Sequence, residues 1–182
     1  MQQQQQPRQG QGQRGGQRPR TMPDLLKFGM TLNLAPEYDR IEYYGRGPIE
    51  NYSDRNISQF LGVYTSTVAD QYFPYIRPQE TGNKTDVRWW KVLNAQGQGL
   101  HIYSDAPLSM SSLNYTTQDL DEGPNKHNMH AADLQPRPYT VVHIDHAQYG
   151  LACVNSWGAT PLDQYKLHYK DYTYSYVIEP IR

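Results

Sequence analysis

Apolar and polar residues alternate over many short stretches of this chain, which is the period of a half-buried β-strand. The clearest stretches are Gly29–Leu34 (GMTLNL) and Arg40–Gly45 (RIEYYG). Glycine, proline, asparagine and aspartate separate the stretches at short intervals, as they do in turns. The pattern predicts strands over residues 29–34, 40–45, 61–68, 85–93, 100–104, 108–113, 140–145, 150–154 and 172–178. In the last of these, Tyr172, Tyr174 and Tyr176 fall on one face.

Helical signals are scarce by comparison. Only residues 117–122 (TQDLDE) offer a capped helical turn, and Gly123 and Pro124 end it at once. Many short strands separated by turns are typical of an antiparallel β-sandwich, or of part of one. The 182 residues suffice for one ordinary domain. We therefore expect an all-β, antiparallel β-sandwich over residues 21–182.

The first twenty residues, MQQQQQPRQGQGQRGGQRPR, differ from the rest in composition. They hold no aliphatic side chain after Met1, so burial of their surface does not offset the entropy of ordering them. We expect a disordered tail or linker over residues 1–20. Four arginines lie in it, which leaves 13 basic against 18 acidic residues in the body, a net charge of −5. Because such a body offers no basic face, nucleic acid is not an expected partner.

Several other classes of function lack their sequence signals. No stretch reaches the length of a membrane span, so a membrane is not an expected partner, and the N-terminus has no secretory-signal pattern. The single cysteine, Cys153, excludes an internal disulfide and leaves the redox compartment open. Cys153 lies in an apolar stretch and no G-x-S-x-G motif occurs, so nucleophilic catalysis is not expected. The segment GRGP is no phosphate loop, because Pro48 lacks an N–H donor.

Two glutamates stand in polar, turn-forming motifs, Glu50 in GPIENYSDR and Glu80 in RPQETGNK. A glycosidase uses two carboxyl groups across the glycosidic bond, one as the acid and the other as nucleophile or base. The alternative is that each carboxylate accepts hydrogen bonds from nearby backbone or pairs with Arg46, Arg55 or Arg77. The residues alone leave both interpretations open.

Histidines and carboxylates with the chemistry of metal ligands occur in two places. His127, His130 and Asp133 (HNMHAAD) would share a face only in a helix, and the prolines on either side leave room for little more than a turn. His143 and His146 (HIDH) are three positions apart, so on a strand they point to opposite faces. We therefore expect no metal or other cofactor in this chain.

Trp157 stands in a turn-rich stretch, VNSWGATP, where a large apolar side chain is unusual. The indole either caps the core of the sandwich or lies open as a platform for a sugar ring, whose C–H groups form an apolar patch. Asn155 and Ser156 would supply polar partners for the hydroxyls around such a ring. The sixteen tyrosines suit strands and sugar-facing surfaces alike. The residues alone favour neither position of Trp157.

Four motifs together resemble the C-terminal region of family 2 β-galactosidases, large multidomain enzymes with a central (β/α)8 barrel. They are YGRGPIENYSDR, QYFPYIRPQETGNKTDVR, the two segments at residues 115–120 and 127–134, and GLACVNSWGATP. The resemblance extends from Phe28 to the C-terminus, and the first two motifs are long enough to be highly specific. It implies that this segment is the later part of the family's last domain, a β-supersandwich similar in fold to galactose mutarotases.

The same resemblance implies roles for several residues. In such enzymes the tryptophan of the SW motif lines the galactose and aglycone site, so Trp157, with Asn155 and Ser156, is expected to bind substrate as an open platform. The family's catalytic glutamates and its Mg²⁺ and Na⁺ ligands come from the barrel, which removes Glu50 and Glu80 as a catalytic pair. The expected structural residues are Arg46, Glu50, Asn51, Arg55, Glu80, Asn83 and Arg88. Some members carry Gly-Gly-Asp-Asp before the SW pair, where this chain has ACVN.

The chain is thus expected to be the C-terminal domain of a retaining β-galactosidase, inactive alone, which contributes an aromatic wall of the active site and domain or subunit contacts. Its expected partners are a galactoside, the remaining domains of the parent enzyme and further copies in a homo-oligomer. The compartment stays open between cytoplasm and periplasm. Three alternatives remain: a free-standing galactoside-binding module, a mutarotase-like enzyme, and a purely structural domain.

Overall fold

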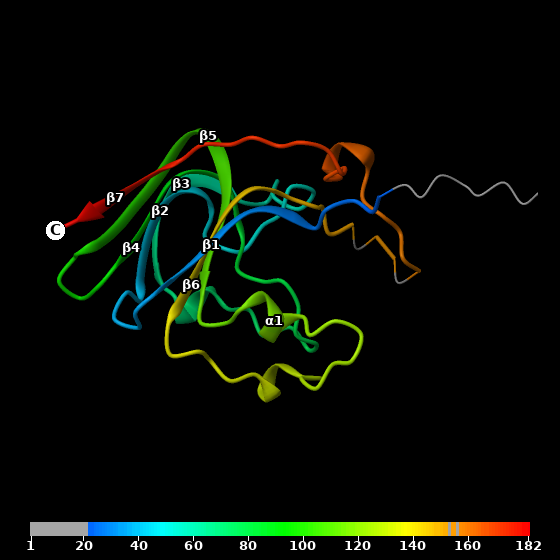
Figure 1. Cartoon of the computed structure of the whole chain (residues 1–182), viewed down its shortest axis with the longest axis horizontal. Helices are drawn as coiled ribbons and strands as arrows, with labels where there is room; N and C mark the ends of the chain where they lie inside the picture. The colour runs from blue at the N-terminus through cyan, green and yellow to red at the C-terminus, as the bar shows by residue number, and fades with distance from the viewer. Residues whose placement is uncertain (1–21, 153, 156) are drawn as a thin grey trace, which may run out of the picture.

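A computed structural model describes residues 22–152, 154–155 and 157–182. Within these residues the chain forms one antiparallel sheet of seven strands, in the order β1-β6-β5-β4-β2-β3, with β7 paired to β5 (Figure 1). The strands are β1 Lys27–Leu34, β2 Arg40–Gly47, β3 Phe60–Thr67, β4 Lys84–Leu93, β5 Gly99–Leu113, β6 Thr140–Gln148 and β7 Val177–Ile181. The all-β, antiparallel class is therefore confirmed, in the form of a curved, open, sandwich-like sheet.

The long strand β5 joins the two halves of the sheet. Its first part, Gly99–Tyr103, lies between β4 and β7, and its last part, Ser109–Leu113, pairs with β6. Figure 1 shows β5 bending between these two parts. The connections between strands hold short helical turns, which are η1 Ala69–Gln71, α1 Thr117–Leu120, η2 Ala131–Asp133 and η3 Asp163–Tyr165.

The core lies against one face of the sheet, because alternate residues of each strand point to that face. Trp90 and Tyr43 are among its largest side chains, with ring centroids 4.7 Å apart and planes inclined by 24°. The Trp90 indole Nε1 donates to Ser112 Oγ at 3.0 Å, which satisfies its one buried donor. The buried members of the core are Ile41, Tyr43, Val68, Val87, Trp90, Val92, Ile102, Leu108, Met110, Val142 and Ile144.

Most predicted strands are confirmed, with ends that differ by at most three residues. The separate strands predicted over 100–104 and 108–113 were wrong, because the chain runs through both as β5. Asp105 and Pro107 resemble a turn in sequence, but they lie between the paired parts of β5. The missing N–H of a proline removes no ladder hydrogen bond at such a position.

The strand predicted over 150–154 was also wrong, since none of its described residues is in a strand. The backbone N–H groups of Leu151 and Ala152 bond to a side chain, Asp54, instead of a neighbouring strand. The last strand begins only at Val177, although Tyr174 and Tyr176 still pack against the core as predicted for one face.

The single predicted helical turn is confirmed as α1. Thr116 caps it, since its hydroxyl accepts the N–H of Asp119 at 3.2 Å while the Asp119 carboxylate accepts the N–H of Thr116 at 2.8 Å. Among the described residues, no helix has the length and apolar character to cross a membrane. The tail predicted over residues 1–20 lies outside the described residues.

Candidate functional site

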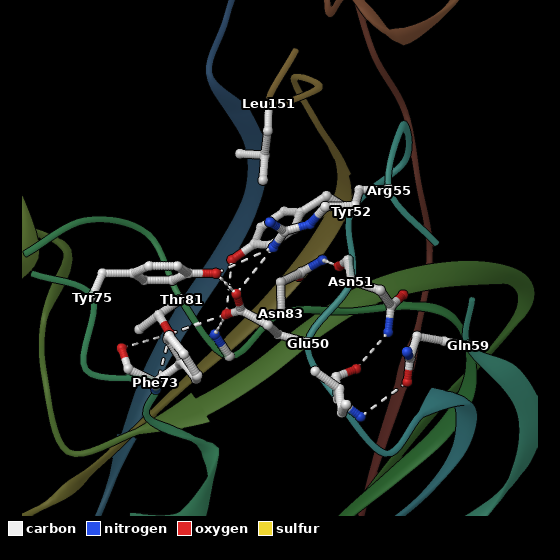
Figure 2. A network of polar contacts seen from close by, with 12 residues as sticks. Glu50, Asn51, Tyr52, Arg55, Gln59, Phe73, Tyr75, Thr81, Asn83 and Leu151 are labelled. Carbon is white, nitrogen blue, oxygen red and sulfur yellow. Dashed lines mark hydrogen bonds and ion pairs between the residues drawn. The ribbon is translucent and has the colours of Figure 1, made fainter. Parts of the chain in front are cut away.

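The motifs GPIENYSDR and RPQETGNK meet around the carboxylate of Glu50 (Figure 2). This carboxylate accepts the N–H of Gly82 at 2.6 Å, the Thr81 hydroxyl at 3.0 Å and Arg55 Nη2 at 3.0 Å. The hydroxyls of Tyr52 and Tyr75 also donate to it. The side chain of Glu50 is 6 % exposed. A carboxylate held by this many donors ties the two loops together.

Beside Glu50, two asparagines join the same loops. The N–H of Asn51 donates to the carbonyl of Asn83, and Asn83 Nδ2 donates to the carbonyl of Asn51, both at 2.8 Å. The Asn51 side chain accepts from the N–H and hydroxyl of Thr85 and donates to the carbonyls of Arg46 and Ile49. Both asparagines are fully buried, so their hydrogen bonds join the two loops inside the protein.

The arginines of the motifs lie at the edge of this junction. Arg46 pairs with Asp86 and donates to the carbonyl of Gln59 at 2.8 Å. Arg55 lies 3.0 Å from Glu50 and 5.3 Å from the ring centroid of Tyr52. Arg88 lies on β4, and its buried Nη1 finds no hydrogen-bond partner among the described residues.

Glu80 has different surroundings, since its carboxylate lies 3.2 Å from Lys27 Nζ and both side chains are partly exposed. It lines a pocket of about 490 Å³ together with Lys27. Glu50 lines another pocket, of about 310 Å³. The structure therefore joins the two motifs, and their glutamates line two different pockets.

The loop that carries Trp157 is held at its base by Asp54, the aspartate of the same YSDR motif. Its carboxylate accepts the N–H of Leu151 at 3.0 Å and the N–H of Ala152 at 2.7 Å; Leu151 is drawn above the Glu50 network in Figure 2. The preceding Gly150 approaches closely, because a Cβ there would lie 2.7 Å from Asp54 Oδ2. Asp54 thus links the hydrogen-bond network around Glu50 to the loop at residues 150–158, called the SW loop below, and this contact was missed by sequence reasoning.

Trp157 itself is 92 % exposed, so the alternative that it caps the core of this chain is wrong. Its backbone N–H donates to Asn155 Oδ1 at 2.9 Å, a turn that orients the two residues. Gly158 follows with φ 78°, a conformation that favours glycine. Ser156, the third predicted binding residue, lies outside the described residues.

The histidines make no metal site among the residues that the structure describes, since no three ligating side chains gather there. His127 lies 3.7 Å from Glu122, and His130 precedes η2. His143 is buried, with Nδ1 2.9 Å from the Thr31 hydroxyl, and burial lowers its pKa to about 3.

Two buried ionisable residues were missed by sequence reasoning. Asp145 follows His143 on the same face of β6, and burial raises its pKa to about 6. Lys84 donates to Gln71 Oε1 at 2.7 Å and to the carbonyl of Gly82 at 3.0 Å, and burial lowers its pKa to about 8. Charged residue types usually indicate exposed positions. Asp145 lies at the end of the strand predicted over 140–145, whereas Lys84 lies just before the one predicted over 85–93, so nothing in the sequence signalled its burial.

Comparison with known proteins places these features in a family. A profile described as "Beta galactosidase small chain" matches residues 3–178. A beta-galactosidase of Priestia megaterium is 33 % identical over 162 residues, which cover 88 % of this chain and 15 % of that protein. Beta-galactosidases of Halalkalibacterium halodurans (35 % over 158 residues, 86 % and 15 %) and Lactobacillus delbrueckii (37 % over 134 residues, 74 % and 13 %) are also similar. The chain thus spans about 15 % of the length of the curated relatives it matches.

Proposed function

This chain belongs to the β-galactosidase small-chain family, and we propose that it serves as the C-terminal domain of a larger β-galactosidase that hydrolyses terminal β-D-galactosides. One observation carries the proposal: a nearly fully exposed indole, Trp157, stands on a loop whose base is fixed by Asp54. An exposed aromatic ring on an anchored loop suits a binding surface completed by other polypeptide.

In the proposed enzyme, Trp157 forms an aromatic wall of the active site. The indole covers the C–H face of the galactose or aglycone ring, which positions the sugar and excludes water from one side. Asn155 orients Trp157 through the bond to its N–H. The wall holds the substrate but does not take part in bond cleavage.

The reacting groups would come from the rest of the parent enzyme. A retaining glycosidase needs one carboxyl group as acid and base and a second as nucleophile, close enough to flank the same bond. Glu50 is occupied by donors from both loops, and Glu80 pairs with Lys27. We therefore expect the isolated chain to be inactive.

The Mg²⁺ and Na⁺ that the resemblance implies do not fit the described part of this chain. The carboxylates nearest the motifs are engaged by arginine, lysine or backbone N–H groups, and no three of the side chains that hold metals come together there. Their ligands would lie in the remaining domains of the parent enzyme.

We further assign domain or subunit contacts to the outer edge of the sheet. β3 is an edge strand, and Phe60 and Val63 on it are 77 % and 61 % exposed. Apolar side chains on an unpaired edge favour association. Sedimentation of the chain should show oligomers that the double variant Phe60→Ser, Val63→Ser converts to monomers; a monodisperse, concentrated unmodified chain would contradict this assignment.

Complementation tests the main proposal. A Priestia megaterium relative truncated by the 162 residues that match this chain should be inactive, and adding this chain should restore hydrolysis of a chromogenic β-galactoside. Trp157→Ala should lower the restored kcat/KM about tenfold, a loss of about 1.4 kcal/mol. Leu162→Ala, which removes another exposed apolar side chain five positions further along the chain, is the matched control. Hydrolysis by this chain alone that falls in Glu50→Gln would overturn the proposal.

Calorimetry with galactose and lactose separates the alternative of a free-standing binding module. A free-standing module built on Trp157 binds sugar saturably at millimolar concentration and loses that binding in Trp157→Ala. A single wall of a composite site gives no saturable binding that Trp157→Ala removes.

A further inference from the structure

The pocket that contains Glu80 is a second place where this chain offers a small molecule both polar and apolar surface. It has a volume of about 490 Å³, within the range of about 300–1,000 Å³ that small-molecule sites occupy. Its walls come from the start of β1, the loop before β4, helix α1 and the end of β6. The pocket is therefore formed entirely by described residues of this chain.

One wall presents both donors and acceptors of hydrogen bonds. Lys27 Nζ lies 3.2 Å from Glu80 Oε2 and 3.5 Å from Oε1, and both side chains remain partly exposed. Gln148 Nε2 donates to Asn83 Oδ1 at 3.2 Å and to Asp145 Oδ2 at 2.9 Å, which directs its amide nitrogen into the protein. A paired ammonium and carboxylate can donate to one hydroxyl and accept from its neighbour, which suits adjacent hydroxyl groups.

The charges around this wall disfavour an anion. The positive charge of Lys27 is offset by Glu80, and the carboxyl group of Asp145 lies buried behind Gln148. Asp121, which also lines the pocket, lies 2.9 Å from Lys126. Among the residues that line the pocket, Lys27 is the one cation against the two carboxylates of Glu80 and Asp121, so a phosphate or carboxylate ligand would meet repulsion and a neutral ligand would not.

The opposite lining is apolar. Leu26, Leu120, Leu151 and Tyr149 line the pocket, and Leu26 is 76 % exposed. A ligand with one C–H face and a rim of hydroxyls can cover these side chains while its hydroxyls meet Lys27 and Glu80. A sugar ring has this distribution, and a short polyol without a ring does not.

We propose that this pocket binds a neutral pyranose, at a site separate from the face of Trp157. The proposal does not depend on the function proposed above. The pocket nevertheless adjoins the SW loop, because Gly150 and Leu151 line the pocket and the same backbone is held by Asp54. Sugar in the pocket would therefore order the base of the loop that carries Trp157.

Titration of the full 182-residue chain, followed by amide NMR, tests this proposal. D-galactose and lactose should shift the amide signals of Thr117, Gly150 and Leu151 with millimolar, saturable affinity. Glycerol and D-glucuronate are the comparison ligands, and both should bind at least several-fold more weakly. Equal binding of glycerol would overturn the need for a ring, and tighter binding of glucuronate would overturn the neutral-ligand assignment.

Variants locate the site. Glu80→Gln keeps the size of the side chain but removes its charge, and should weaken sugar binding several-fold. Thr117→Val changes the same pocket away from the ion pair and should weaken sugar binding as well. Glu179→Gln, on β7, is the matched control and should change nothing. Trp157→Ala should also leave the sugar-induced amide shifts unchanged. A failure of the active-site proposal would appear only in the complementation kinetics.

The absence of saturable amide shifts in the pocket of the folded chain would overturn the inference.

Discussion

The carboxylate of Asp54 accepts the backbone N–H of Ala152 at 2.7 Å, across 98 positions of the chain. Ala152 has φ 57°, a left-handed conformation that is uncommon for a residue with a Cβ. Such a conformation persists where surrounding contacts hold it, and here two successive N–H groups point to one carboxylate. The pairing makes Asp54 the residue that positions the SW loop relative to the rest of the fold.

We expect Asp54→Ala to release the base of this loop while leaving the sheet folded. Hydrogen exchange at the amides of Leu151 and Ala152 should become about tenfold faster or more, since their shared acceptor is lost. Asp163→Ala, which removes an 82 % exposed carboxylate from η3, is the control and should leave these amides unchanged. Unaltered exchange in Asp54→Ala would show that other contacts hold the loop.

Truncation of two tryptophans should have very different effects on the free energy of unfolding. Trp157→Ala should change the free energy of unfolding by less than about 0.5 kcal/mol, because the indole is almost fully exposed. Trp90→Ala should lower it by about 3–5 kcal/mol, because a fully buried ring stacked on Tyr43 leaves a cavity. Denaturant titrations measure both values. A large loss in Trp157→Ala would mean that the indole is buried after all.

The two motif glutamates should also differ in their contribution to stability. Glu50→Gln places an amide NH₂ among groups that donate, so we expect a loss of roughly 1–3 kcal/mol from unsatisfied buried donors. Glu80→Gln weakens only a partly exposed pair with Lys27 and should cost less than about 1 kcal/mol. Chemical denaturation of the two variants measures the difference. Equal losses would contradict the unequal burial of the two carboxylates.

His143 and Asp145 should oppose each other in the pH dependence of stability. Burial lowers the pKa of His143 from 6.5 to about 3 and raises the pKa of Asp145 from 3.8 to about 6. Between about pH 4 and 6 the unfolded chain therefore binds one more proton at His143 and one fewer at Asp145 than the native chain. The two contributions cancel, so this pair leaves stability nearly independent of pH there.

Asp145→Asn removes the contribution of Asp145 to the free energy of unfolding, which falls with rising pH. It keeps the contribution of His143, which rises with pH. Relative to the unmodified chain, its free energy of unfolding should increase by about 1.4 kcal/mol per pH unit between about pH 4 and 6. Urea titrations across this range measure the two slopes, and Lys27 and Glu80 are present in both proteins. His143→Gln should give the opposite relative slope, and parallel curves for all three proteins would refute the cancellation.

Much of the fold could be predicted because strand formation follows local patterns. Alternation of apolar and polar residues marks which side of a strand is buried, and it located β1 to β4 and β6. It failed at Asp105 and Pro107, where turn-forming residues lie within β5, and at residues 150–152, where apolar residues are held by Asp54. In both places contacts with distant segments outweigh local preference.

The candidate site, like the fold, could be predicted from the sequence only in part. The residues alone indicated that Trp157, Glu50 and Glu80 were unusual, and the motifs around them identified the family. Whether Trp157 was open or buried, and whether the two glutamates met, depended on how separate loops close on the sheet, and only the tertiary structure decided it. Sequence determines burial along one strand through its period, whereas the pairing of Glu50 with Gly82 or of Asp54 with Ala152 depends on the register of strands far apart in the chain.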